Sequence, residues 1–380
     1  MEKRLYLDHA SGTFINPEII SDYQQFERDY GSNPSAVHTE GRAARDKLET
    51  ARASVASLIG ANADSIVFTS GGTEADNLGL LGAARALGGY KNEILIGKTE
   101  HDAIRSCIPE LLARGHAVID IPCDRNGVIT PELLKSVMAD RTGLVCVQSA
   151  NHETGAVQPV RELCRVAHDN GALFMTDAVQ MIRYLKTDVL ETDVDILTLS
   201  GHKIGAPEGS GALYIRPCAP VRPILFGGGQ EKGIRPGTQN VSACYGLGLA
   251  CDYLSTNGDK DSRKVRMLRD LLKVRLDQIP DVRVHRAAQT LPGHLNVSFM
   301  GVEGEVMQAM MDRRGIAIST GASCRSNSGQ PSPVLAAMGV DAWENRCAVR
   351  ISLGPELSEE DMIRVSEAFS DVAERYRKAK

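Results

Sequence analysis

Features of secreted and membrane proteins are missing from this sequence. The cysteines number nine, an odd count, and no two are spaced as Cys-x-x-Cys, which disfavours a disulfide framework or a zinc site. No apolar stretch approaches membrane-spanning length, and residues 1–8 lack the apolar core of a signal peptide. We therefore expect a cytoplasmic protein with reduced thiols, no resident metal and no contact with membranes.

An excess of positive charge is missing as well. The 43 Lys and Arg against 48 Asp and Glu give a net charge of −5, and the basic residues are scattered along the chain. Such a charge distribution does not predict direct binding of nucleic acid. A small molecule or another protein is the favoured partner.

The 380 residues are more than one typical hydrophobic core holds, so we expect two domains. Between about residues 40 and 255, short apolar runs alternate with helical patterns. This order is typical of an α/β fold in which helices cover both faces of a mainly parallel sheet. The seven predicted strands contain residues 66–69, 94–96, 117–121, 144–147, 173–175, 196–199 and 212–215.

The order of elements changes after about residue 256. Helices over residues 261–279, 303–314 and from 358 onward, with strands near 282–285, 295–299, 317–319 and 348–352, predict a smaller α+β domain. We expect a large domain of residues 15–255 and a small domain of residues 1–14 and 256–380. The polar, glycine-containing residues 256–261 are the predicted linker.

A carboxylate and a lysine follow two successive strands. Asp177 ends an apolar run, and Lys203 follows the next run in Ser200-Gly-His-Lys203. Ligands of parallel sheets bind at the carboxyl ends of strands. Pyridoxal phosphate needs an anion at its pyridine nitrogen and an amine for its Schiff base, so this pair predicts an enzyme that uses that cofactor. Taken singly, a capping Asp and a solvated surface Lys are the commoner interpretations.

A glycine-rich turn could hold the phosphate. Thr69-Ser-Gly-Gly-Thr-Glu74 follows a strand and opens a helix, so Gly71, Gly72 and Thr73 can present amides to an anion. Ser200 and His202 would add donors. An ordinary capped strand–turn–helix is the alternative for the turn taken alone.

Two further polar residues suit a ligand site. His101 follows the strand of residues 94–96 and could stack on the cofactor ring and move protons. A histidine with a purely structural role is an equally good interpretation of this residue taken alone. Arg350 lies inside a strand pattern, where an unpaired guanidinium is costly. Its predicted partner is a carboxylate, either of the substrate or of a structural Asp or Glu.

Cys324 differs from the other cysteines. It lies in a polar loop of small residues, 319–332, beside Arg325, whose charge favours the thiolate. We interpret it as a candidate nucleophile; an incidental surface cysteine is the alternative.

Together these segments resemble the cysteine desulfurases of the NifS/IscS type, fold-type I enzymes, over essentially the whole chain. The resemblance implies a homodimer in which Thr238, in the segment 227–238, reaches the phosphate in the partner subunit. It also implies a Schiff base on Lys203, ring contacts from Asp177 and Gln180, and a persulfide on Cys324. Substrate binding would fall to Arg350 and Asn33.

The chain departs from the family pattern at three places. Asn151-His-Glu153 stands where Asn-Asn-Glu is usual, so His152 would contact the ring hydroxyl. Residues 8–13 follow Asp-x-x-Ala-Thr-Thr only loosely, and residues 321–324 read Gly-Ala-Ser-Cys where Gly-Ser-Ala-Cys is usual. An imidazole N–H can still donate to an oxygen.

The implied reaction converts L-cysteine to L-alanine and passes sulfur through Cys324 to an acceptor protein. Iron–sulfur cluster assembly, tRNA thiolation and DNA phosphorothioation remain open as its destination. Other chemistry on the same cofactor, such as selenocysteine lyase or aminotransferase activity, and a silent scaffold homologue are the alternatives. A nicotinamide dehydrogenase is disfavoured because no Gly-x-Gly-x-x-Gly follows the first strand.

Overall fold

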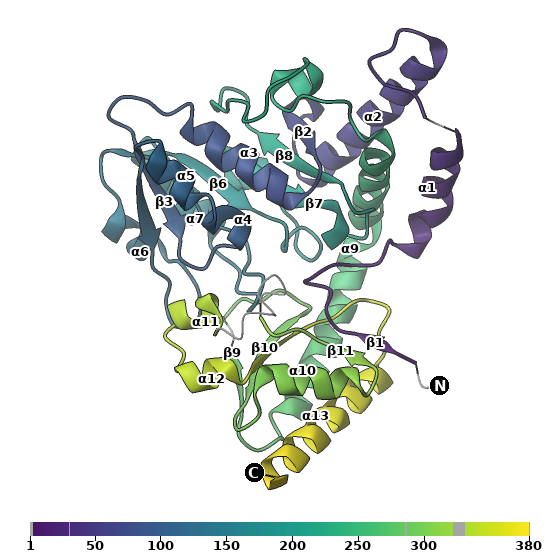
Figure 1. Ribbon diagram of the computed structural model, residues 1–380, viewed down its shortest axis with the longest axis vertical. Coiled ribbons are helices and arrows are strands. Elements are labelled where there is room, and N and C mark those ends of the chain that lie inside the picture. The colour runs from purple at the N-terminus through teal and green to yellow at the C-terminus, as the bar shows by residue number, and fades with distance from the viewer. Residues whose placement is uncertain (1–2, 30, 286, 322–330, 380) are drawn as a thin grey trace.

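A seven-stranded sheet forms the centre of the computed structural model, which describes residues 3–29, 31–285, 287–321 and 331–379 (Figure 1). Its order is β2-β8-β7-β6-β5-β3-β4, and only β8 runs antiparallel to its neighbours among these strands. The prediction of a mainly parallel seven-stranded sheet is confirmed. The strands are β2 (Ile66–Thr69), β3 (Glu93–Gly97), β4 (Ala117–Ile121), β5 (Thr142–Cys146), β6 (Leu173–Asp177), β7 (Ile196–Ser200) and β8 (Gly211–Ile215).

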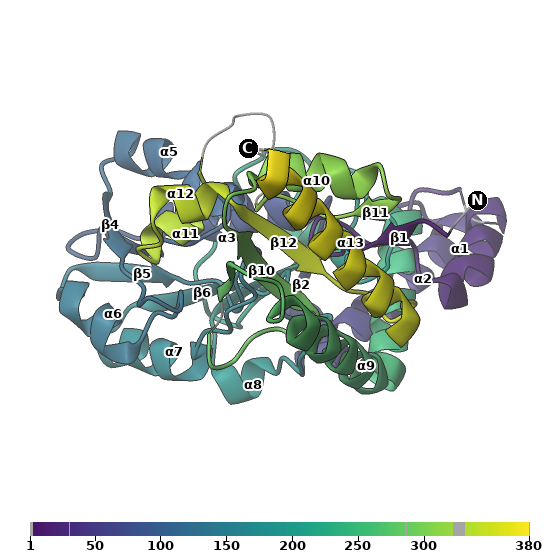
Figure 2. The same cartoon turned by 90° about the horizontal axis from the view of Figure 1, so that it is seen from below.

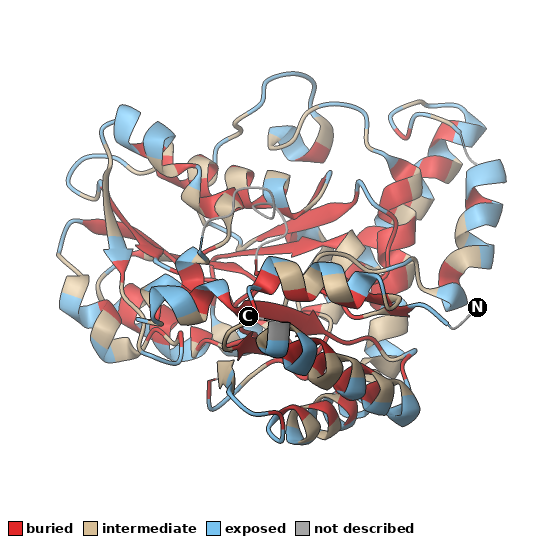
Figure 3. Cartoon of the chain, turned by 60° about the horizontal axis from the view of Figure 1, so that its bottom comes forward, coloured by how far each residue is buried: buried red, intermediate tan, exposed pale blue. Residues whose placement is uncertain are grey.

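Successive side chains of a strand point to opposite faces of the sheet. Because apolar residues fill neighbouring positions of these strands, both faces of the sheet are apolar. One face packs against α1, α2, α6, α7 and the first half of α9, and the other against α3, α4 and α5. Figure 3 shows the resulting layers, with buried strands between helices whose outer surfaces are exposed. These helices are α1 (Pro17–Asp29), α2 (Thr39–Leu58), α3 (Gly72–Ala84), α4 (Asp102–Arg105), α5 (Ile108–Ala113), α6 (Pro131–Val137), α7 (Val160–Asp169) and α9 (Val241–Leu276); α8 (Val189–Thr192) precedes β7.

A second group of elements surrounds a three-stranded antiparallel sheet of order β12-β10-β9. Figure 2 shows this sheet beside α13 and the end of α9. The N-terminal segment joins it, since β1 pairs with β11 and both Leu5 and Leu7 are buried in the same apolar cluster. The exact division into two domains stays a prediction. The elements are β1 (Leu5–Tyr6), β9 (Val282–His285), β10 (His294–Phe299), α10 (Gly304–Asp312), β11 (Ile316–Ala317), α11 (Pro333–Ala337), α12 (Ala342–Arg346), β12 (Ala348–Ser352) and α13 (Glu359–Ala379).

The predicted linker at residues 256–261 is wrong. These residues lie inside α9, a continuous helix of 36 residues that passes from one group of elements to the other (Figure 1). Polar side chains there bond back to the preceding turn, with Thr256 Oγ1 donating to the carbonyl of Asp252 and Asn257 Nδ2 to that of Tyr253. Burial of Cys251 before this stretch and Val265 after it keeps the helix in register.

None of the helices formed by the described residues combines the length and apolarity needed to cross a bilayer.

Candidate active site

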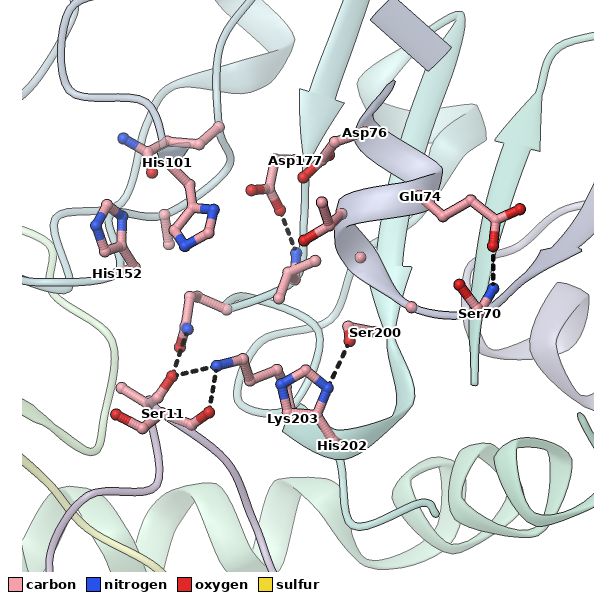
Figure 4. A pocket seen from close by; sticks show the side chains of 18 of the residues that line it. Ser11, Ser70, Glu74, Asp76, His101, His152, Asp177, Ser200, His202 and Lys203 are labelled. Carbon is pink, nitrogen blue, oxygen red and sulfur yellow. Dashed lines mark hydrogen bonds between the residues drawn. The ribbon is translucent and has the colours of Figure 1, made fainter. Parts of the chain in front are cut away.

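A cavity of about 360 Å³ opens at the carboxyl ends of the central strands. Figure 4 shows side chains from the sheet, from α3 and from the N-terminal segment converging on it. Ten of the predicted site residues line it: Gly72, Thr73, His101, His152, Asp177, Gln180, Ser200, His202, Lys203 and Arg350.

Lys203 lies one short turn after β7, in the 3₁₀ segment Gly201–Lys203. Its Nζ donates to the carbonyls of Ala10 at 2.5 Å and Ser11 at 2.8 Å (Figure 4). The turn is tight, since a Cβ on Gly201 would lie 2.0 Å from Ser210 Oγ. The amine is thus held in the cavity by backbone oxygens of the N-terminal segment, a contact that sequence reasoning did not supply.

The turn before α3 suits a phosphate. Gly71 has φ 154° and ψ −178°, a conformation that side chains disfavour, and it opens a 13-residue helix whose first amides are available to an anion. A Cβ on Gly72 would lie 3.0 Å from Val179 and 3.2 Å from Ser200, so any larger residue would have to displace these side chains. Ser200 Oγ lies 2.9 Å from His202 Nδ1, and burial lowers the pKa of His202 to about 4, which makes it a neutral donor.

Asp177 is one of two adjacent buried carboxyls. Its Oδ1 accepts from the Val179 amide at 2.8 Å, while Asp76 of α3 accepts from Thr198 Oγ1 at 2.7 Å. Burial and then the charge of Asp177 raise the pKa of Asp76 well above its usual value. Burial also raises the pKa of Asp177, but the Val179 amide, the charge of Lys203 and the Thr198 hydroxyl oppose it. Asp76 therefore holds a proton more firmly than Asp177 does. Asp177 is the better of the two as an anion beside a pyridine nitrogen.

Sequence reasoning missed Asp76 and Thr198. Two signals were available in the sequence. Asp76 lies two residues after Glu74, near the start of a predicted helix, and Thr198 lies two residues before Ser200, so both side chains point to the same face of the strand.

His101 and His152 contact each other edge to face, with ring centroids 5.1 Å apart at 86°. Burial lowers the pKa of both, for His152 well below its usual value. Because His101 Nδ1 accepts from the Ala103 amide, its neutral ring carries the proton on Nε2. His152 Nδ1 is buried without a hydrogen-bond partner among the described residues, so it could bond to the hydroxyl group on the ring of a bound pyridoxal phosphate.

Arg350 lies in β12, buried, and reaches the cavity from the smaller sheet. Its Nη2 donates to Asp8 Oδ1 at 2.8 Å and to Ser11 Oγ at 2.6 Å, and its Nη1 to the His152 carbonyl. The structural carboxylate expected from sequence is therefore Asp8. Since the guanidinium still borders the cavity, it can also contact a substrate carboxylate.

Two predicted residues lie away from the cavity, and a third is not described. Asn33 is exposed, and its Oδ1 accepts from the Ser35 amide within a turn, away from the cavity. Thr238 is exposed and does not line the cavity of its own chain. Cys324 lies outside the described residues. Both described flanks of its segment lie beside Glu153: Ser332 Oγ donates to Glu153 Oε2 at 2.6 Å, and a Cβ added to Gly321 would lie 2.8 Å from that oxygen.

Exposure of a cysteine does not by itself identify a nucleophile. Among the eight described cysteines, Cys218 is exposed. Burial raises the pKa of Cys107 to about 11 and those of Cys164 and Cys244 to about 12, so these thiols are poor nucleophiles at neutral pH.

Comparisons with known proteins agree with this geometry. The family model "Aminotransferase class-V" matches residues 5–365. The curated relatives include "Cysteine desulfurase IscS" of Dictyoglomus turgidum, 35% identical over 99% of this chain and 96% of that protein. Another is "Probable cysteine desulfurase, mitochondrial" of Dictyostelium discoideum, 37% identical over 98% of this chain and 84% of that protein.

Two solved structures are similar along nearly their whole length. A "NifS-like protein" has a TM-score of 0.92 at 30% identity and covers 98% of this chain and 100% of its own. "SspA in complex with cysteine" has a TM-score of 0.83 at 29% identity and covers 93% of this chain and 99% of its own.

Proposed function

This chain belongs to the class-V aminotransferase family, and we propose that it converts L-cysteine to L-alanine and transfers the sulfur to Cys324 as a persulfide. Its cofactor is pyridoxal phosphate. The observation that carries the proposal is the convergence of Lys203, Asp177 and the turn before α3 on one cavity. These are the three contacts that the cofactor requires, and the cavity residues fit it.

Each contact has a separate physical task. The amides of Gly72 and Thr73, with Ser200 and His202, would hold the phosphate. Lys203 Nζ would bind the cofactor carbon, and Asp177 would lie at the ring nitrogen. When bound, the cofactor supplies an electron sink for the carbanion at the substrate α-carbon.

The remaining steps belong to side chains of this chain. Arg350 would orient the substrate carboxylate, and the Lys203 amine would take the α-proton. The Cys324 thiolate attacks the substrate Sγ; the new S–S bond forms as the Cβ–Sγ bond breaks. The carbon skeleton gains protons and leaves as alanine. L-Cysteine and one thiol thus give alanine and one persulfide, and the reaction needs no oxidant.

The family resemblance supports a homodimer in which Thr238 of one subunit completes the phosphate site of the other. The exposed position of Thr238 away from its own cavity agrees with this arrangement. A cytoplasmic location and a protein acceptor for the sulfur complete the proposal. The acceptor's identity is not part of it.

A direct test incubates the purified protein with L-cysteine and a thiol reductant and quantifies alanine. The wild type and Lys378→Ala, which removes an exposed lysine of α13, should produce alanine and show the visible absorbance of bound cofactor. Lys203→Ala should lose both. Alanine production by Lys203→Ala at the wild-type rate would overturn the proposal.

A further inference from the structure

The segment that carries Thr238 is fastened to its own chain at two points. We call residues 227–240 the Thr238 arm. At the first point Glu231, buried, receives Nη1 and Nη2 of Arg52 at 2.6 and 2.9 Å and the amide of Phe68 at 2.8 Å. Gln239, also in the arm, donates to the same carboxylate at 3.0 Å. Glu231 has φ 46°, an uncommon conformation for a residue other than glycine, which these contacts hold in place.

At the second point Arg235 of the arm contacts the turn before α3, residues 69–74, which we call the phosphate turn. Its Nε donates to Glu74 Oε1 at 2.7 Å, and its Nη2 lies 3.4 Å from Oε2. Glu74 Oε2 also accepts from the Ser70 amide at 2.6 Å (Figure 4). Glu74 and Ser70 both line the cavity, whereas Arg235 does not. The ion pair is largely buried, with 23% of the Arg235 side chain and 17% of the Glu74 side chain exposed.

The charge of Arg235 matters at this position. Glu74 lies in the first turn of α3, where it would repel the phosphate that the same turn binds. Burial favours a protonated Glu74, but the hydrogen bonds from Arg235 and Ser70 outweigh it and hold its pKa below the usual value. The carboxylate is therefore charged, and Arg235 is the cation that neutralises it beside the phosphate site.

Between the two fastened points and α9, the backbone around Thr238 is fixed. The Gly237 amide donates to Gln230 Oε1 at 3.1 Å, and Asn240 caps α9 by accepting from the Ala243 amide. Thr238 itself is exposed and does not line the cavity of its own chain. The arm thus presents Thr238 outward from a base that includes the phosphate turn of the same chain.

We propose that Arg235 is a positioning residue that connects the phosphate turn of its own subunit to the Thr238 arm serving the partner subunit. One ion pair, Arg235 with Glu74, then supports phosphate binding at both sites of the dimer. The inference rests on the homodimer of the proposed function and goes beyond it by naming the link between the two sites.

The first experiment measures the dissociation constant of pyridoxal phosphate by absorbance titration of the apoprotein. Arg235→Met should weaken binding about tenfold or more, because it leaves the largely buried Glu74 carboxylate without its counter-charge beside the phosphate. Arg235→Lys keeps the positive charge but not the two guanidinium donors, so its affinity should lie between those of Arg235→Met and the wild type. Arg346→Met, at an exposed arginine of α12, should leave affinity unchanged.

A double-mutant cycle separates the ion pair from general loss of structure. In the Glu74→Gln background, Arg235→Met should cause no further loss of affinity, because its charged partner is already gone. An equal additional loss in that background, or an unchanged dissociation constant for Arg235→Met alone, would overturn the inference.

Hybrid dimers test the link between subunits. A hybrid of one wild-type subunit with one Lys203→Ala subunit has a single site able to form the visible absorbance. Placing Arg235→Met on the Lys203-bearing subunit alters the phosphate turn of that site; placing it on the other subunit alters the arm that reaches it. Both placements should weaken binding at the reporting site. An effect from only one placement, or from neither, would contradict the link.

Analytical ultracentrifugation distinguishes the two levels of failure. A wild-type protein that sediments as a monomer would overturn the homodimer and the inference together. If the wild type is a dimer and Arg235→Met leaves the dissociation constant of pyridoxal phosphate unchanged, only the inference is overturned.

Discussion

At the residue scale, the site depends on which of two neighbouring carboxyls carries the charge. Asp76 and Asp177 are both buried, and Thr198 donates to the first. Two like charges this close in a low-dielectric site do not both ionise readily. The Thr198 hydroxyl lowers the pKa of both carboxyls. Asp177 also has the Val179 amide and the nearby Lys203 to stabilise its anion, whereas burial and the charge of Asp177 raise the pKa of Asp76.

This asymmetry predicts opposite outcomes for one chemical change. Because the pKa of Asp76 is the one raised well above its usual value, Asp76→Asn replaces the carboxyl that favours the neutral form by a neutral isostere, and affinity for pyridoxal phosphate should stay within about threefold of wild type. Asp177→Asn removes the anion at the ring nitrogen and should weaken binding about tenfold or more. Titration of both apoproteins measures the difference. A larger loss for Asp76→Asn than for Asp177→Asn would reverse our assignment of the charge.

Residues that follow strand ends were predictable, because the edge of a parallel sheet collects them in one place. Lys203 and Asp177 are examples, and the cavity contains both. Arg350 was predicted to need a carboxylate, but its partner Asp8 is 342 positions away in sequence. No local pattern identifies such a pair. The same holds for Arg52 and Glu231, which only the folded chain brings together.

At the element scale, α9 shows how burial overrides local composition. Asn257-Gly-Asp259 favours a turn by propensity, yet apolar residues before and after it keep one continuous helical face buried. Strand predictions succeeded for the opposite reason: in the central sheet, composition and burial agree.

Gly258 gives a test of this helix. A Cβ at Gly258 would make only ordinary contacts, at 3.8 Å from Leu254, so Gly258→Ala should stabilise the protein by about 0.5–1 kcal/mol through helix propensity. Gly339 has φ 77° and open space around it, so Gly339→Ala should destabilise by about 1 kcal/mol. Urea unfolding measures both. Destabilisation by Gly258→Ala would indicate that this stretch is not a regular helix.

At the scale of the whole molecule, folding excludes protons from buried histidines. Neither ring nitrogen of His294 has a hydrogen-bond partner within the described part of the chain, and burial lowers its pKa to about 3. The unfolded chain protonates this ring near pH 6.5, whereas the folded chain does not. The stability it contributes is therefore present above pH 6.5 and is lost as the pH falls toward 3.

The expected size follows from linkage. Between pH 7.5 and 5.5, His294 should account for about 1.4 kcal/mol of the loss in unfolding free energy. His294→Leu, which buries an apolar side chain instead, should show a correspondingly smaller loss over the same interval. Urea unfolding at both pH values measures it. An identical pH dependence in the variant would mean that His294 titrates normally in the folded protein.

The central claim is that Cys324 receives the substrate sulfur, and one comparison of thiols tests it most directly. The wild type, Cys324→Ala and Cys218→Ala, the last removing the exposed cysteine among those described, are mixed with L-cysteine and a reductant, and alanine and sulfide are quantified together. The wild type and Cys218→Ala should yield equal amounts of both products, while Cys324→Ala should keep the cofactor absorbance and lose turnover by about 100-fold or more. Undiminished alanine and sulfide from Cys324→Ala would contradict the account.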